Sequence, residues 1–129
     1  MNKSFLPALA VLVLAGAVTR ADTAPILSHD VFFSLNDASP AARAALVAAC
    51  KKYLTGHEGE LSFSAGVRNS ELNRPVNDHD FDVALHITFA SKAAHDQYQA
   101  APRHKQFIAE NEKNWKTVRV FDSVAEAAQ

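Results

Sequence analysis

Four short segments of the chain alternate between apolar and polar residues, which is typical of strands that bury one face. They are residues 26–35, 60–68, 81–89 and 117–124. In the third segment the alternation separates two sets of side chains: Phe81, Val83, Leu85, Ile87 and Phe89 on one face, and Asp82, Ala84, His86 and Thr88 on the other. We therefore expect four strands that turn their apolar faces toward a common core.

Helical periodicity and capping signals lie between these strands. Ser39 and Pro40 suit the N-cap and the first position of a helix, and Gly56 suits its C-terminal cap. Ser91 and Pro102 begin two further helical pieces, while a polar stretch that contains a proline predicts a long connection. The predicted helices are residues 36–56, 91–100 and 102–116, and the predicted connection is 69–80.

The resulting order, β-α-β-β-α-β, predicts an α+β protein of ferredoxin-like topology. In this arrangement a four-stranded antiparallel sheet carries its helices on one face. The other face presents Phe32 beside small or polar residues, which suits a partly polar interface with another sheet. We therefore expect a homodimer formed through the sheet.

The first 21 residues differ from the rest of the chain. Residues 5–18 are nearly all apolar, and Lys3 is the only charged residue before Arg20. This run has the length of a signal-peptide core and falls short of the ~20 residues that span a bilayer. We expect a signal peptide over 1–21, export to the periplasm or the extracellular space, and no stable membrane insertion after cleavage. An uncleaved anchor or a buried N-terminal helix is the alternative.

The charge and cysteine content of the chain argue against a nucleic-acid partner and against an intramolecular disulfide. The chain has 13 basic and 14 acidic residues and a net charge of −1, so no electrostatic argument supports a nucleic-acid partner. Its single cysteine, Cys50, cannot form an intramolecular disulfide. Cys50 lies in an alanine-rich helical pattern, where a buried, inert thiol is expected.

The sequence contains no recognisable metal-binding spacing. Its six histidines include no His-Glu-x-x-His pair, and one cysteine cannot build a structural zinc site. Asp78, Asp80 and Asp82 alternate like the start of a calcium loop, but the required glycine and distal glutamate do not follow. A turn is the favoured interpretation, and we expect neither a metal nor another cofactor.

Four ordered blocks resemble the stress-responsive α/β-barrel family, often called Dabb. They are SHDVFFSL, FDVALHITF, YQAAPRHKQF and WKTVRVFDS, which begin at residues 28, 81, 98 and 115. The resemblance covers residues 26–124. It implies a ferredoxin-like protomer that pairs with a second copy to form a dimeric α+β barrel.

The resemblance also implies site residues, by comparison with a plant polyketide cyclase of that family, olivetolic acid cyclase. Tyr98 and His104 fall on its catalytic tyrosine and histidine, and Asp122 falls on the aspartate close to that histidine. The cyclase closes a poly-β-ketone by aldol condensation without metal or organic cofactor. Its pocket-lining positions fall on His29, Val31, Phe33, Leu85, Trp115, Val118 and Val120.

Three hypotheses about function follow, of which one is a purely structural dimer. In the first, an exported Dabb dimer binds a small, partly apolar molecule or serves a stress-related role. In the second, His104 is the general base and Tyr98 the oxyanion donor of a cofactor-independent, cyclase-like enzyme, and Asp122 orients the His104 imidazole. The chain departs from the cyclase at Ala101 and Val83, where the cyclase has histidines, so the resemblance does not define a substrate.

Overall fold

The computed structural model describes residue 16 and residues 25–126. All but one residue of the predicted signal peptide therefore lies outside the described residues. Within the described residues, no helix has the length and apolar character needed to cross a membrane.

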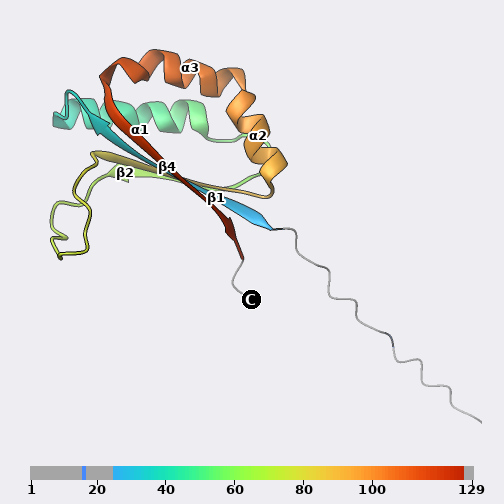
Figure 1. Ribbon diagram of the computed structural model, residues 1–129. Helices are drawn as coiled ribbons and strands as arrows, with labels where there is room; N and C mark the ends of the chain where they lie inside the picture. Colours follow the sequence, from blue (N-terminus) through green and yellow to red (C-terminus); the bar gives the residue numbers. More distant parts are fainter. Residues whose placement is uncertain (1–15, 17–24, 127–129) are drawn as a thin grey trace, which may run out of the picture.

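One four-stranded antiparallel sheet, in the order β2-β3-β1-β4, forms the base of the molecule. The three helices gather on one side of this sheet (Figure 1). The sequence prediction of a ferredoxin-like α+β fold is confirmed. The elements are β1 (Ile26–Leu35), α1 (Pro40–Leu54), β2 (Glu60–Val67), β3 (Val83–Phe89), α2 (Lys92–Ala100), α3 (Pro102–Asn111), the 3-10 helix η1 (Glu112–Asn114) and β4 (Trp115–Ala125).

Helix α1 begins and ends where its capping residues predict. The Ser39 hydroxyl accepts a hydrogen bond from the backbone N–H of Ala42 at 3.2 Å, and Pro40 occupies the first turn. After Leu54 the chain leaves the helix through Gly56, whose φ of 72° is available to glycine without strain. The buried residues of α1 are Leu46, Cys50, Tyr53 and Leu54, so the helix packs one face against the sheet.

The central strand β1 positions the helix-facing side of the sheet. His29, Val31 and Phe33 alternate along it and are all buried. Each pairs with a residue of β4 that points to the same face, His29 with Asp122, Val31 with Val120 and Phe33 with Val118. The sequence alternation of these two strands therefore brings six side chains under the helices.

The alternation fails at the start of β3. This strand begins at Val83, so the prediction that Phe81 shares the core face of Val83 is wrong. The Phe81 ring instead packs against Phe32, with ring centroids 5.1 Å apart. The Asp82 carboxylate accepts a hydrogen bond from the backbone N–H of Leu35 at 2.9 Å. This bond satisfies a backbone donor that would otherwise be unpaired, and it holds the chain out of regular pleating.

The predicted helix 102–116 is also shorter in the structure. Helix α3 ends at Asn111, and Trp115 is the first residue of β4. The Asn114 side chain bonds the backbone of Asp37 in both directions, accepting from its N–H at 2.8 Å and donating to its carbonyl at 3.0 Å. These two bonds fix the start of β4 beside the connection between β1 and α1.

Candidate functional site

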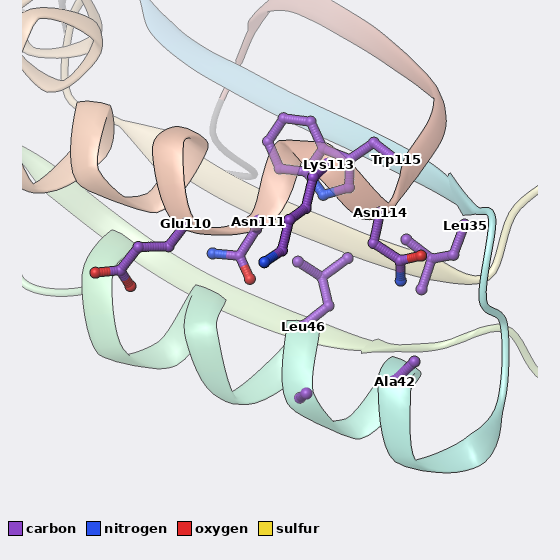
Figure 2. A pocket seen from close by; sticks show the side chains of 9 residues that line it. Leu35, Ala42, Leu46, Glu110, Asn111, Lys113, Asn114 and Trp115 are labelled. Carbon is purple, nitrogen blue, oxygen red and sulfur yellow. The ribbon is translucent and has the colours of Figure 1, made fainter.

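Two cavities share Trp115 as a wall. The α1 cavity has a volume of about 210 Å³, and Figure 2 shows Leu46 of α1 reaching toward Asn111 and Trp115 across it. The central cavity has a volume of about 170 Å³. The α1 cavity is lined by Leu35, Ala42, Ala45, Leu46, Glu110, Asn111, Lys113, Asn114 and Trp115. The central cavity is lined by His29, Val31, Phe33, Leu54, Leu85, Tyr98, Gln99, His104, Phe107, Ile108, Trp115, Val118 and Val120.

Nearly all the catalytic and pocket residues predicted from the sequence line the central cavity. All seven implied pocket residues line it, and so do Tyr98 and His104. Strand alternation explains this grouping, because every second residue of β1, β3 and β4 faces the helices. Asp122 is not among the lining residues. The functional roles of these residues stay a prediction.

Tyr98 and His104 lie against each other inside this cavity. Their ring centroids are 4.6 Å apart. Tyr98 stands in the last turn of α2 and His104 in the first turn of α3, and Pro102 begins the new helix between them. Because the chain turns there, two residues that one continuous helix would hold farther apart come into ring contact.

Burial makes both groups neutral at neutral pH. Tyr98 is 1% exposed and His104 is 9% exposed. Burial raises the pKa of Tyr98, and nearby Cys50 and Glu60 raise it further. Burial lowers the pKa of His104, against a smaller opposing effect of the Gln99 backbone. The pair therefore offers a phenol donor beside an uncharged imidazole.

One polar atom of this pair lacks a partner. The buried Nδ1 of His104 has no hydrogen bond within the described part of the chain. The same holds for the buried indole Nε1 of Trp115, a residue that lines both cavities. A buried donor or acceptor left unpaired costs about 1–3 kcal/mol.

Asp122 pairs with His29 and not with His104, whereas the resemblance implied that it orients the His104 imidazole. Its Oδ1 lies 2.6 Å from Nδ1 of His29, its neighbour across the β1–β4 pairing. No hydrogen bond or ion pair between Asp122 and His104 occurs among the described residues. The physical reason is the register, because strand pairing places Asp122 directly opposite His29.

His95 is a site residue that the sequence analysis missed. It projects from α2, one turn before Tyr98, and its ring centroid lies 4.8 Å from that of His29. Its Nε2 is 4.0 Å from Oδ1 of Asp122. Burial lowers the pKa of His95 and neighbouring His29 adds to this effect, while Asp122 and Asp96 oppose it. The i, i+3 spacing of His95 and Tyr98 was the available signal, because it places both on one helix face.

The other candidate groups have structural roles. Burial raises the pKa of the Cys50 thiol to about 12, which fits the expected inert cysteine. The carboxylate of Asp78 accepts from the Asp80 backbone N–H and from Arg119, at 2.7 and 3.1 Å. Asp82 pairs with Arg43 at 3.2 Å. These aspartates therefore have separate partners, as a turn requires.

Comparison with known proteins identifies relatives by family and by fold. A family model described as "Stress responsive A/B Barrel Domain" matches residues 27–125. No curated protein matches the chain significantly.

Solved structures share the fold at low sequence identity. A dimeric ferredoxin-like protein of unknown function from Thermobifida fusca is 14% identical, with a TM-score of 0.67 over 79% of this chain and 92% of that one. A Dabb family protein from Mesorhizobium loti is 23% identical, with a TM-score of 0.66 over 80% and 99%. A hydroxynitrile lyase from Passiflora edulis is 19% identical, with a TM-score of 0.63 over 81% and 96%.

Proposed function

The chain belongs to the stress-responsive A/B barrel domain family, and on that premise we propose that its central cavity binds a small, partly apolar molecule. The observation that carries the proposal is that Tyr98 and His104, whose ring centroids are 4.6 Å apart, border a cavity otherwise lined mostly by apolar side chains. Ligand pockets commonly combine an apolar lining with a few convergent polar groups that orient the ligand. Tyr98 and His104 supply those groups here.

The cavity volume limits the ligand. At about 170 Å³, the space is close to that of an engineered cavity of about 150 Å³ that holds benzene. A molecule with one ring and a small polar substituent fits this volume. The neutral Tyr98 hydroxyl donates to a carbonyl oxygen, and the His104 imidazole pairs with a hydroxyl.

Benzaldehyde and toluene form a matched pair of probes for this proposal. We expect benzaldehyde to bind more tightly, and Tyr98→Phe to weaken its binding roughly 3- to 10-fold, which corresponds to one net hydrogen bond. Tyr53→Phe is the control, because the Tyr53 hydroxyl donates to Glu110 at 2.5 Å and does not line the cavity. Titration followed by protein NMR measures the affinities. Equal affinity for the two probes, or no binding of either, contradicts the proposal.

A second candidate is catalysis at the same site, favoured by the ring contact of Tyr98 with His104. A neutral imidazole accepts a proton from an activated methylene, and a phenol donates a hydrogen bond to the developing oxyanion. This is the chemistry of a cofactor-independent, cyclase-like aldol enzyme. A small β-diketone and an aromatic hydroxynitrile are suitable probes. His104→Gln should lower turnover at least about 100-fold while binding persists; undiminished turnover contradicts the assignment.

Export is proposed on the N-terminal composition. The apolar run over 5–18 and the small residues Thr19 and Ala21 support cleavage after Ala21, and the sequence AGA at 15–17 offers an earlier site. The intact mass of the protein from the cell envelope or medium should correspond to a chain that starts at Asp22, or at Val18 if the earlier site is used. Leu12→Arg places a charge inside the apolar run and should leave the protein uncleaved in the cytoplasm. A full-length chain in the cytoplasm without this change contradicts the proposal.

A further inference from the structure

We propose that His29, His95 and Asp122 bind a divalent transition-metal ion beside the central cavity. The three residues come from β1, α2 and β4, and one ligand atom of each lies within 4.8 Å of the others. This site goes beyond the proposed function, which uses neither His95 nor Asp122.

The distances fit a site that closes around an ion. Asp122 Oδ1 is 2.6 Å from His29 Nδ1 and 4.0 Å from His95 Nε2. Tetrahedral Zn²⁺ bonds of about 2.0–2.1 Å place neighbouring donor atoms roughly 3.3 Å apart. The two distances to Asp122 must therefore open and close by about 0.7 Å, and Asp122, whose side chain is 43% exposed, has room to make that movement. The donor atoms of the two imidazoles, which lie within 4.8 Å of each other, must also approach, by up to about 1.5 Å.

His95 is already oriented with its Nε2 toward the proposed ion. Its Nδ1 faces the carboxylate of Asp96 at 3.7 Å, and Asp96 is held by Lys92 at 2.6 Å. Its Nε2 lies 3.3 Å from the amide nitrogen of Gln99, which is a donor. These contacts fit the tautomer with the proton on Nδ1, in which the Nε2 lone pair accepts from Gln99. An ion at Nε2 would replace that hydrogen bond. Metal-binding histidines are commonly oriented by a carboxylate on their other nitrogen in this way.

The donor set indicates the class of ion. Two imidazoles and one carboxylate suit Zn²⁺, Cu²⁺ or Fe²⁺ better than Ca²⁺ or Mg²⁺, which prefer oxygen ligands. Three protein ligands leave at least one coordination position for water or another ligand. His29 also lines the central cavity, so the open position is close to the space proposed for the organic molecule.

The molecule contains its own control for this inference. On the opposite face of the sheet, His86 Nδ1 pairs with Asp30 Oδ1 at 2.6 Å, the same contact that joins His29 and Asp122. Among the described residues, no second histidine joins His86 and Asp30 to make a group of three possible metal ligands. A pair of this kind alone gives two ligands, so the third ligand, His95, separates metal binding from ordinary pairing.

Zinc titration tests the site. The protein purified from cells expressing the full chain is treated with a chelator, and Zn²⁺ is added under isothermal titration calorimetry. We expect one Zn²⁺ per chain and a loss of affinity of at least about 10-fold in His95→Ala and in Asp122→Asn. His86→Ala should leave the affinity unchanged. Co²⁺ in place of Zn²⁺ should give a visible absorption band that His95→Ala removes.

Folding and ligand binding are checked in parallel. Thermal unfolding identifies any variant that fails to fold, and His95→Gln then replaces His95→Ala. Tyr98→Phe should not change the Zn²⁺ affinity, so failure of the organic-ligand proposal is distinguishable from failure of this one. Zn²⁺ binding weaker than about 0.1 mM, or binding that His95→Ala and His86→Ala weaken equally, overturns the inference.

Discussion

His104 illustrates how one buried side chain links stability to pH. Burial lowers its pKa in the folded protein, whereas an unfolded histidine titrates near about 6.5. Below that pH the unfolded chain binds a proton that the folded chain resists. The contribution of neutral His104 is therefore fully present above the unfolded pKa and is lost as the pH falls below it.

His104→Gln should make the protein less sensitive to acid. We expect the free energy of unfolding to fall less steeply between about pH 7 and pH 5 in this variant than in the parent, because the proton taken up by unfolded His104 no longer contributes. Urea unfolding at several pH values measures the slopes. His95, whose pKa is also lowered, leaves a residual slope that His95→Gln should reduce further. Identical slopes in parent and variant contradict this account.

At the scale of elements, the contact between α2 and the turn before β2 holds the helix that carries His95 and Tyr98. Gly59 has a φ of 77°, and a Cβ added there would lie 2.5 Å from Cβ of Ala94 in the first turn of α2. Real Cβ atoms do not approach so closely, so only glycine allows α2 to pack at this distance. The Gly59 carbonyl also accepts from the backbone N–H of Ala90 at 2.8 Å, just before α2 begins.

Gly59→Ala should therefore destabilise the protein by roughly 2–4 kcal/mol, from left-handed strain together with overpacking. Gly56→Ala is the matched control, because Gly56 has a φ of 72° but no neighbour within 4 Å of an added Cβ. It should lose only the strain part, roughly 1–2 kcal/mol. Denaturant unfolding measures both. A Gly59→Ala variant no less stable than Gly56→Ala would show that α2 moves without cost.

The elements also show how far the sequence predicts this molecule. The bounds of β1 and the cap of α1 follow from alternation and from Ser39, which are local signals. The apolar–polar alternation fails at Asp82 because its carboxylate accepts a hydrogen bond from the N–H of Leu35, a contact across 47 positions of sequence. The ring contact of Tyr98 with His104 follows from a local turn, but a site drawn from β1, α2 and β4 depends on register. No spacing in the sequence therefore brings His95 to Asp122.

At the scale of the whole molecule, the face of the sheet opposite the helices carries an aromatic cluster of Phe32, Phe81 and Phe121. Phe32 lies 5.1 Å from Phe81 and 5.7 Å from Phe121, by ring centroids. Phe121 remains 53% exposed. An exposed aromatic group on an uncovered sheet is typical of a surface that binds a partner. We propose that a second copy of the chain covers it, as the sequence analysis expected.

Phe121→Asp tests this dimer directly. A charge placed in the aromatic cluster must be desolvated against the partner, so we expect the dimer dissociation constant to rise roughly 30-fold or more, as for a central interface residue. Val76→Asp is the control, because Val76 is 82% exposed and lies in the connection between β2 and β3. Light scattering after gel filtration, over a range of protein concentrations, measures the mass. The unmodified protein should be a dimer, and Val76→Asp should remain one. A monomeric parent protein, or a Phe121→Asp variant that stays dimeric at every concentration, would show that the aromatic face is not the interface.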